Sequence, residues 1–517
     1  MMNFKNIFGI LAISAVSMMT VSCSEDIMDR INKDKAHPGE SVVSAKFQLT
    51  DAIVSSVFTT NTGNFAWYVA SYTEQILGTG NNQLKNAELR SINETAAAST
   101  FDNEWNGTYL NLNNIQQMIA KCEEGSNSAG QLDIKAMGQI LAAYDWGIMT
   151  DLFGNIPCSE AFKVSAPKLD TQEDIYKHIL ELLDAAKGNL DQAIAGNMKN
   201  AGAFDVLFNG NLTQWRGLAH ALKARYLLHE VGRATDKNAQ YAQILEEILQ
   251  EANAAVADGF NGANLNIFDG NNQIDAWSAY WVSREYSASS KTVNDLMVAR
   301  QDPREAIYNY NGADYYGAPA ELGLMTPGDK EAAGATSATN FPLWFWNGVN
   351  EVKIPSHLMS KSELYFIIAE VKARLGQNAK DDFETAVKAS LADYATVGAT
   401  EFSAEDVAAY LAGETAAKFA ANPLSEILVQ KYIAQTRDEQ LETFNDMRRC
   451  KYLDGSYPVA MTNPNNTQAG QNRLPLRLPY GSSDVLSNPN VKEAFGSGND
   501  AGKYIFTENV WWAGGSR

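Results

Sequence analysis

The sequence predicts a mainly α-helical protein in which helix pairs stack side by side and a second lobe, rich in loops but still mostly helical, packs on them. Three observations support this prediction. Apolar residues recur at helical spacing in many segments, the links between most of these segments are short, and glycine, asparagine and proline gather between residues 258 and 361. Long helices joined by short links are typical of stacked helix pairs in a solenoid-like layer.

Amphipathic stripes and their boundary residues locate the individual helices. Segments 101–119 and 175–193 each carry apolar residues three or four positions apart, which indicates a helix with one buried face. Thr171 and Asp174 form a start signal for the second of these helices, and Gly376 is placed to end another stripe. Further helices are expected at 44–59, 64–77, 131–151, 213–232, 238–257, 362–375, 380–394, 404–412 and 424–448, whereas the tail 452–517 is expected to be loop-rich with short extended pieces at most.

The beginning of the sequence has the pattern of an export signal. The apolar run at 7–21 is shorter than the roughly 20 residues that a membrane span needs, but it suits a secretory signal. A small residue precedes Cys23, as in bacterial lipoprotein signals, although Thr20 stands where leucine is usual. We therefore predict a signal peptide at 1–22, lipid attachment at Cys23 and a polar tether at 23–40. The alternative is an ordinary export signal with an incidental cysteine.

Composition limits what the rest of the chain can bind. The chain has 61 acidic and 41 basic residues and a formal net charge of −20, which argues against nucleic acid as a partner and against electrostatic docking on anionic lipid. A hydrophobic content of 45% is ample for a large core. We divide this body into a helical region at 41–258 and a loop-rich lobe with packed helices at 259–517.

Motifs for catalysis, metal or cofactor binding are missing from the sequence. His229-Glu230 lacks the second histidine of HExxH, and neither G-x-S-x-G nor a phosphate-binding glycine loop occurs. The remaining cysteines, Cys122, Cys158 and Cys450, have no metal-binding spacing and are expected to be core thiols. A glycoside hydrolase needs two carboxylates about 5–5.5 Å or about 6.5–9.5 Å apart, a condition that 61 acids meet by chance. We expect no enzyme, no metal and no cofactor.

A set of motifs in a fixed order resembles one protein family. Residues 150–162 read Thr-Asp-Leu-Phe-Gly-Asn-Ile-Pro-Cys-Ser-Glu-Ala-Phe and resemble the motif D-x-F-G-[DN]-I-P-[YF]-[ST]-E-A of the SusD/RagB lipoproteins, which are nutrient-binding outer-membrane proteins of Bacteroidetes. Cys158 departs from the aromatic residue of this motif. Further pieces that resemble the family lie at 105–115, 172–186, 362–370, 442–449 and 510–512.

These motif residues are expected to support the fold rather than to bind a ligand. Asp151 is placed to bond backbone amides in the turn after its helix, and Gly154 can adopt a positive φ. The glutamates of the 362–370 motif share a helical face, and we expect them, or Asp446, to meet the arginines at 448 and 449. The family motifs therefore identify the chain without marking its ligand site.

The resemblance implies a fold and a function. Members have four tetratricopeptide-like helix pairs and a less regular lobe that carries the ligand site. They act at the cell surface as a lid on a SusC-like TonB-dependent barrel in the outer membrane, and they capture glycans or, in some branches, peptides. For this chain the resemblance implies a lipid-anchored, surface-facing nutrient-binding protein. A peptide-binding member of the same family and a helical-repeat interaction scaffold are the alternatives.

Two aromatic regions are candidates for the ligand site. Sugars present apolar C–H faces, which suit aromatic platforms, and a rim of hydroxyls, which suits amide and charged side chains. The opposing interpretation is that a tryptophan or tyrosine on a helix usually belongs to the core. The candidates in the first region are Trp277, Tyr280, Trp281, Tyr286, Tyr315, Tyr316, Trp344 and Trp346, and those in the second are Trp67, Tyr72, Asn81 and Asn82.

Overall fold

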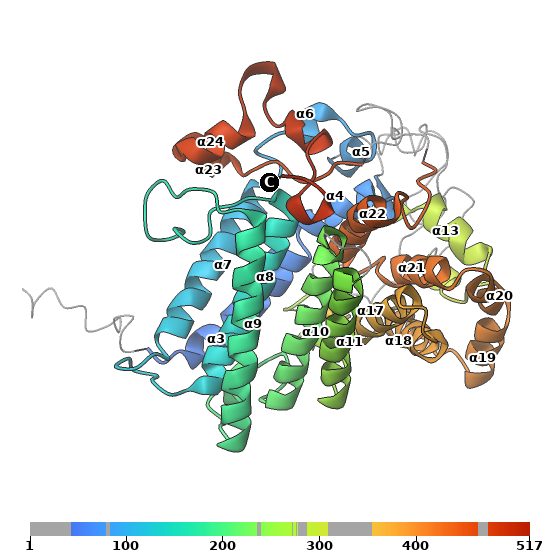
Figure 1. The fold of residues 1–517 in the computed structure, drawn as a ribbon, viewed down its shortest axis with the longest axis horizontal. Coiled ribbons are helices and arrows are strands. Elements are labelled where there is room, and N and C mark those ends of the chain that lie inside the picture. The colour runs from blue at the N-terminus through green and yellow to red at the C-terminus, as the bar shows by residue number, and fades with distance from the viewer. Residues whose placement is uncertain are drawn as a thin grey trace, which may run out of the picture.

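The computed structural model describes residues 43–78, 83–234, 239–270, 272–275, 277, 287–308, 354–463 and 474–516. Most of these residues lie in helices, and the described strands form two antiparallel two-stranded sheets, β1 with β3 and β2 with β4. The predicted mainly α fold is confirmed (Figure 1). Within the described ranges, no helix has both the length and the apolar character needed to cross a bilayer.

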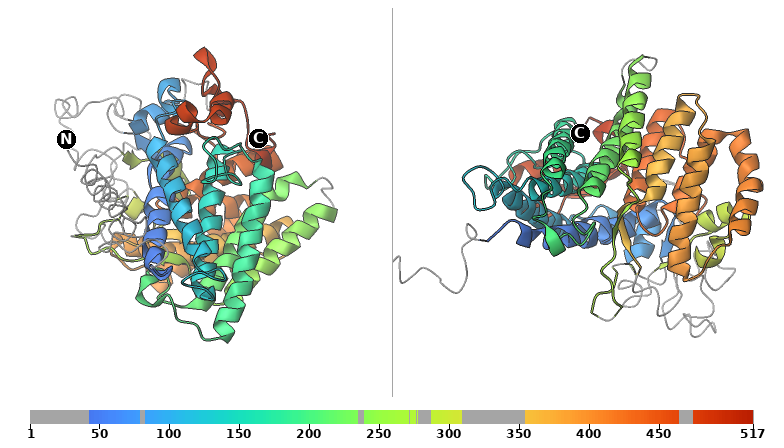
Figure 2. Two further views of the ribbon diagram at one scale, coloured as in Figure 1. Left: turned by 90° about the vertical axis from the view of Figure 1, so that its left-hand side faces the viewer. Right: turned by 90° about the horizontal axis from the view of Figure 1, so that it is seen from below.

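Eight helices stack in sequence order, and each contacts the next. Helices α7 to α11 stand side by side in Figure 1, and the view from below in Figure 2 shows the layer continuing into α17 and α18. This arrangement is the helix-pair superhelix that the sequence predicts. The four pairs are α3 (Lys46–Ser55) with α7 (Asp102–Ala120), α8 (Leu132–Phe153) with α9 (Gln172–Ala195), α10 (Leu212–Glu230) with α11 (Ala239–Ala257), and α17 (Lys361–Arg374) with α18 (Lys380–Gly398).

The other elements connect or cover this stack. Between α3 and α7 lie a π-helical turn (Ser56–Asn61), α4 (Asn64–Tyr72), β1 (Ile76–Gly78), α5 (Gln83–Glu88) and α6 (Ile92–Thr95). Between α11 and α17 lie β2 (Ala263–Leu265), β3 (Ser287–Ser289), α13 (Lys291–Val298), α14 (Glu305–Tyr308) and β4 (Ser356–Met359). After α18 come α19 (Ala404–Ala412), α20 (Glu414–Ala421), α21 (Pro423–Ala434), α22 (Gln440–Asp454), α23 (Ser482–Ser487) and α24 (Pro489–Phe495). Single 3₁₀ turns lie at Gly202–Phe204, Val231–Arg233, Gly498–Asp500, Lys503–Phe506 and Trp511–Ala513.

Several predicted boundaries are confirmed and three are wrong. The Thr171 side chain accepts a hydrogen bond from the Asp174 amide at 3.1 Å, and Gly376 has φ +70°. The helix expected at 64–77 ends at residue 72 and β1 follows, whereas the tail forms α23 and α24 instead of extended pieces. The helix expected at 424–448 is two helices. It breaks at Glu439, which has φ +66° and whose carboxylate accepts hydrogen bonds from the amide and hydroxyl of Ser360.

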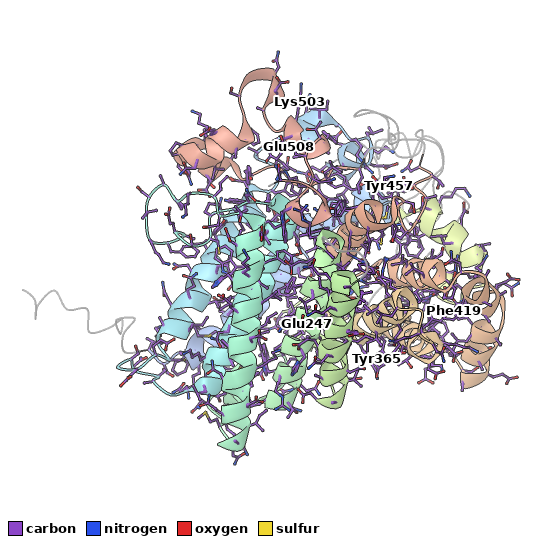
Figure 3. The ribbon with its side chains drawn as sticks, viewed as in Figure 1. Glu247, Tyr365, Phe419, Tyr457, Lys503 and Glu508 are labelled. Atoms are coloured by element: carbon purple, nitrogen blue, oxygen red, sulfur yellow. The ribbon has the colours of Figure 1, made fainter. Side chains whose placement is uncertain are left out.

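Side chains fill the space between the helices (Figure 3). One apolar core runs through the stack and under the C-terminal tail. A smaller apolar cluster joins α17, α18 and α20, where the rings of Phe383 and Phe419 stack at 4.6 Å. Tyr365 and Phe419, both labelled in Figure 3, pack against this smaller cluster. The outer helices α19 and α20 are therefore held on the stack by apolar contact of their own.

Buried ion pairs join the helices at the centre of the molecule. Arg449 of α22 donates to both carboxylate oxygens of Glu370 of α17, at 2.6 and 2.8 Å, and to Asp446 at 2.8 Å. The predicted link between the 362–370 and 442–449 motifs is thus confirmed for this pair. Glu363 instead pairs with Arg225 of α10.

Asp151, at the end of α8, collects hydrogen bonds from distant parts of the chain. Its buried carboxylate accepts from the indole N–H of Trp512 at 2.8 Å, from the side-chain amide of Asn445 at 3.2 Å and from the hydroxyl of Tyr176. The expectation that Asp151 bonds backbone amides is therefore wrong, because its carboxylate accepts hydrogen bonds from side chains of α9, α22 and the C-terminal 3₁₀ turn instead. Arg448 likewise donates to the backbone carbonyl of Asp151 at 2.8 Å rather than to a glutamate. These bonds fasten the C-terminus to the helix stack.

His229 of α10 lies buried between two carboxylates. Its Nε2 is 2.9 Å from Glu442, and its Nδ1 is 3.3 Å from Asp151. Burial alone lowers the pKa of a histidine, but Glu442 and Asp151 outweigh it and raise the pKa of His229 from 6.5 to about 9. The imidazole is therefore a cation at neutral pH, and its charge is part of the core.

We predict that His229 makes the protein less stable at alkaline pH. Because the folded-state pKa is above the unfolded one, the stabilisation is complete below pH 6.5 and is lost as the pH rises through about 9. At 1.36 kcal/mol per pKa unit the loss is about 3 kcal/mol. Urea unfolding at both ends of this range measures it. His229→Gln should flatten the profile, while His178→Gln should keep it; an unchanged alkaline slope in His229→Gln contradicts the assignment.

Candidate functional site

The short sheet β1–β3 places described flanks of the two candidate regions next to each other. Gly78 of β1 is opposite Ser287 of β3, and Ile76 is opposite Ser289. Segment 79–82 follows β1, and segment 278–286 precedes β3. The described ends of both segments are therefore neighbours, although more than half of the helix stack lies between them in the sequence. We call β1, β3 and the two glutamates that bind their flanks, Glu74 and Glu88, the β1 corner.

Segment 309–353, which holds the remaining candidates of the first region, begins at the same corner. Tyr308, the last residue of α14, is fully buried. Its hydroxyl donates to the backbone carbonyl of Gln75 at 2.6 Å and accepts from the amide of Ser290 at 2.7 Å. The chain therefore enters segment 309–353 from a residue that is bonded to both β1 and β3 flanks.

Glu74 is the centre of this arrangement. It has φ +61°, which is uncommon for a residue with a long side chain and is maintained only where surrounding bonds compensate for it. Its carboxylate accepts from the Thr292 hydroxyl at 2.5 Å and from the amides of Thr462 and Asn463 at 2.9 and 3.1 Å. Burial raises the pKa of this carboxyl group above its ordinary value, and the hydrogen bonds oppose that rise.

Glu88 of α5 also binds residues of the β1 corner. One of its carboxylate oxygens accepts from the Gly78 amide at 3.1 Å, and the other accepts from the Asn463 side chain at 2.8 Å. Lys85 lies 3.0 Å from Glu88 in a buried ion pair. Described flanks of segments 79–82, 309–353 and 464–473 are thus bonded to one small group of buried side chains among α4, α5 and α13 (Figure 1). Ser287, which follows segment 278–286, pairs with Gly78 in the β1–β3 sheet.

Two predicted platform residues belong to the core instead. Trp277 is 2% exposed and packs on the half-buried ring of Trp67, with 6.1 Å between the ring centroids. Tyr72 is fully buried, with the Arg90 guanidinium 5.2 Å from its ring centre. Tyr72 and Trp277 are therefore corrected to core residues. Of the described candidates, Trp67 alone keeps part of its side chain exposed.

The other predicted residues lie outside the described part of the chain. They are Asn81, Asn82, Tyr280, Trp281, Tyr286, Tyr315, Tyr316, Trp344 and Trp346, together with the lipid-attachment residue Cys23. For these residues the structure gives the position of the flanks and nothing more. Their role stays a prediction.

A polar pocket near the aromatic region was missed by the sequence analysis. It has a volume of about 100 Å³ and lies beside β2 and β4, lined by Asn264, His357, Asp393, Arg437, Asp438 and Glu439, among others. Arg437 joins it to the aromatic region through Asp275, two residues before Trp277, at 2.8 Å. One buried oxygen of Asp438 has no hydrogen-bond partner among the described residues, and burial raises the pKa of this carboxyl group to about 6, against the effect of Arg437.

A signal for this pocket was present in the sequence. The charged run Arg437-Asp438-Glu439 interrupts a segment whose apolar spacing otherwise favours one long helix. Buried polar groups without partners are rare in folded proteins and often mark functional positions. The pocket therefore offers hydrogen-bonding groups near Asp275 and Trp277.

The described residues contain one group whose ligand atoms lie close enough together to hold a metal ion. Asp151, His229 and Glu442 offer ligand atoms within 4.8 Å of one another. The Nε2 atom of His229 already lies 2.9 Å from Glu442, and its Nδ1 atom lies 2.8 Å from the Tyr176 hydroxyl and 3.3 Å from Asp151. These contacts form a buried network that links α8, α9, α10 and α22.

We predict that Trp277→Ala destabilises the protein. Removing a buried tryptophan leaves a cavity next to Trp67, and such truncations cost about 3–5 kcal/mol. The free energy of unfolding in urea measures the effect. Leu486→Ala is the control, because Leu486 is 84% exposed and should change stability little. A stability loss no larger than that of the control contradicts the core assignment.

Comparisons with known proteins agree with this architecture. A sequence model of a SusD-like family, described as starch-binding and associating with the outer membrane, matches residues 39–481. A crystal structure of a SusD/RagB family protein from Bacteroides thetaiotaomicron is 32% identical, with a TM-score of 0.77 over 92% of this chain and 100% of that one. A chitin-binding SusD homolog from Flavobacterium johnsoniae is 19% identical, with a TM-score of 0.65 over 90% and 98%.

A SusD homolog from Bacteroides fragilis shares the fold at 22% identity, with a TM-score of 0.64 over 92% of this chain and 100% of that one. The search of curated proteins found no match. The family match covers most of the sequence, and the helix stack and the order of the motifs agree with it. This chain therefore belongs to the SusD/RagB family.

Proposed function

We propose that this protein captures a glycan at the cell surface and passes it, chemically unchanged, to a SusC-like TonB-dependent barrel in the outer membrane. The observation that carries the proposal is the β1 corner. There the flanks of three segments rich in aromatic and amide side chains are bonded to one buried group. Members of the family are binding proteins rather than enzymes, which fits capture without chemistry.

The composition of these segments favours a neutral glycan. Aromatic rings present a flat apolar surface to the C–H faces of a sugar, and amide groups bond its hydroxyls. The net charge of −20 repels acidic polymers over the whole surface. The polar pocket beside β4 adds carboxylate, amide and imidazole groups next to the Asp275–Trp277 segment.

The buried bonds of the corner favour a site that is largely formed before the ligand arrives. Glu74 and Glu88 fix the backbone amides of Gly78, Thr462 and Asn463. Binding to a preorganised site loses less conformational entropy than binding that must order loops from the beginning. Affinity need only be moderate, because delivery to a transporter requires release.

The proposed location rests on the sequence and on the family. The family is described as associating with the outer membrane. Lipid attachment at Cys23 would hold the protein there, since an acyl chain contributes about 0.8 kcal/mol for each buried methylene and several chains together anchor firmly. The outward orientation and the position over a barrel transporter are what the family resemblance implies.

The proposed function is tested with purified protein and a panel of soluble glycans that includes starch and chitin oligosaccharides, with short peptides beside them. Isothermal titration measures binding, and chromatography of the mixture measures products. The proposal predicts binding of at least one glycan and no shorter sugars. Binding of peptides alone supports the peptide-binding alternative, and release of shorter sugars contradicts capture without chemistry.

We predict that Trp281→Ala weakens glycan binding and leaves stability nearly unchanged. Loss of one stacking ring should reduce affinity about tenfold, or about 1.4 kcal/mol. Titration with the glycan found in the panel gives the affinity, and circular dichroism with thermal melting gives the stability. Trp277→Ala is the contrasting variant, because Trp277 is buried and should lose stability. A large stability loss in Trp281→Ala would place Trp281 in the core.

We also predict that Cys23→Ala releases the protein from membranes. Without the thiol, no lipid can be attached, and no helix of the described residues is suited to span the bilayer in its place. Fractionation of cells that express each form shows the distribution. Retention of Cys23→Ala in the lipid fraction rules out the anchor.

A further inference from the structure

The polar pocket beside β2 and β4 contains a buried carboxylate oxygen that has no partner within the described chain. The pocket lies between these two strands, α18 and the loop that joins α21 to α22. Asp438 of this loop lines the pocket and is 5% exposed. Arg437 donates to one oxygen of its carboxylate at 3.0 Å, whereas the other oxygen makes no hydrogen bond to the described residues. Because such acceptors are rare in protein interiors, a ligand that donates to Asp438 explains it best.

Two more hydrogen-bond acceptors line the same pocket. Asp393 of α18 is half-buried, and its carboxylate forms no hydrogen bond or ion pair with the described residues. On β4, the Nδ1 atom of His357 is 2.6 Å from the side-chain oxygen of Asn264. An amide oxygen only accepts, so Nδ1 carries the proton, and burial lowers the pKa of the ring and keeps it neutral at pH 7. Nε2 is therefore left as an acceptor.

The charges around the pocket leave one negative charge in excess. Asp275, Asp393 and Asp438 carry the negative charges. Arg437 pairs with two of them, Asp275 at 2.8 Å and Asp438 at 3.0 Å. Burial raises the pKa of Asp393 above its ordinary value and that of Asp438 to about 6, so Asp438 is still mostly ionised at pH 7. Lys361 opposes the rise at Asp393, but it does not line the pocket and forms no ion pair with Asp393.

The remaining carboxyl group of the pocket and a metal ion do not account for these acceptors. The carboxylate of Glu439 already accepts hydrogen bonds from the amide and hydroxyl of Ser360, and burial together with Glu363 raises its pKa well above the ordinary range. A metal ion needs ligand atoms close together, and among the described residues no three acidic or histidine ligand atoms of this pocket lie within 4.8 Å of one another. A donor with several N–H groups suits the acceptors better.

The size of the pocket limits the occupant to one chemical group. Its volume of about 100 Å³ is smaller than the roughly 300–1,000 Å³ of sites that enclose a whole small molecule. A primary ammonium group has three N–H donors, no acceptor and one positive charge. These properties match three acceptors and one excess negative charge. The net charge of −20 attracts such a group to the protein.

We propose that the polar pocket binds a primary ammonium group, and that this group belongs to an amino sugar unit of the captured glycan. The inference rests on the proposed function and narrows it: the glycan is neutral along the aromatic segments and carries at least one unacetylated amino group. Arg437 in the pocket wall bonds Asp275, two residues before Trp277, so the pocket lies beside the aromatic region. The ammonium group donates to the free acceptors of the pocket.

The first test compares oligosaccharides of one length from chitin, chitosan and cellulose. They share one linkage and carry an acetamide, an ammonium and a hydroxyl group, respectively, at the same carbon. Isothermal titration at pH 7 should give an affinity for the chitosan oligosaccharide that is about tenfold higher than for the other two. Equal affinities, or binding of the chitin or cellulose oligosaccharides alone, overturn the inference and leave the proposed function standing.

Methylammonium chloride tests the pocket without a glycan. It should raise the melting temperature of the wild type above that in an equal concentration of sodium chloride, because a ligand of the folded state stabilises it by mass action. It should not do so in Asp438→Asn. Equal melting of the wild type in the two salts overturns the inference. If methylammonium binds while every glycan in the panel fails, the ammonium site stands and the proposed function falls.

Matched variants on α18 locate the effect. Asp393→Asn keeps the shape of a side chain that bonds no described residue, so the affinity for the chitosan oligosaccharide should fall about tenfold without loss of stability. Asp381→Asn makes the same change in net charge at an exposed position outside the pocket and should bind as the wild type does. Equal losses in the two variants, or none in Asp393→Asn, overturn the inference. A lysine-containing peptide that binds in place of chitosan, and is lost in Asp393→Asn, overturns the amino sugar assignment in favour of a peptide amine.

Discussion

Arg449 of α22 lies buried between Glu370 of α17 and Asp446, and its guanidinium is held at hydrogen-bond distance by both carboxylates. A buried arginine without such partners costs about 3–5 kcal/mol. The position of helix α22 therefore depends on the contact between its Arg449 and Glu370 of α17. Arg225 of α10 imposes the same condition through Glu363. These ion pairs fix the register of α10, α17 and α22, whereas apolar contact alone tolerates small shifts.

Helix α22 also contacts the β1 corner. The side-chain amide of Gln75, next to β1, donates to the backbone of Tyr432 in α21 at 3.1 Å and to the hydroxyl of Thr443 in α22 at 3.0 Å. Glu74 and Tyr308 then bind the flanks of the aromatic segments to this point. The proposed glycan site therefore depends on β1, β1 depends on α22, and α22 depends on the buried ion pairs.

Local signals in the sequence predicted the parts of the fold that depend on local interactions. Amphipathic spacing located the stacked helices, and Thr171 and Gly376 marked helix ends, because capping involves residues three or four positions apart. The contact between Trp512 and Asp151 joins residues 361 positions apart, and no local pattern shows it. The break at Glu439 had a local sign in the charged run Arg437-Asp438-Glu439, but the partner that stabilises it, Ser360, is distant in the sequence.

The two aromatic regions stay predictions from composition, and the structure places their described flanks at the β1–β3 pair. Composition cannot separate a ring that belongs to the core from a ring that touches a ligand. Trp277 and Tyr72 are core rings because Trp67, Arg90 and their neighbours cover them.

The dependence of the β1 corner on the charged core is tested most directly by hydrogen exchange in the Glu370→Gln variant. This change leaves Arg449 and Arg374 short of a counter-charge. Our account predicts faster exchange of the amides in β1 and β3 together with those of α17 and α22, as one cooperative unit. Unchanged exchange in β1 and β3, while α17 and α22 open, would contradict it.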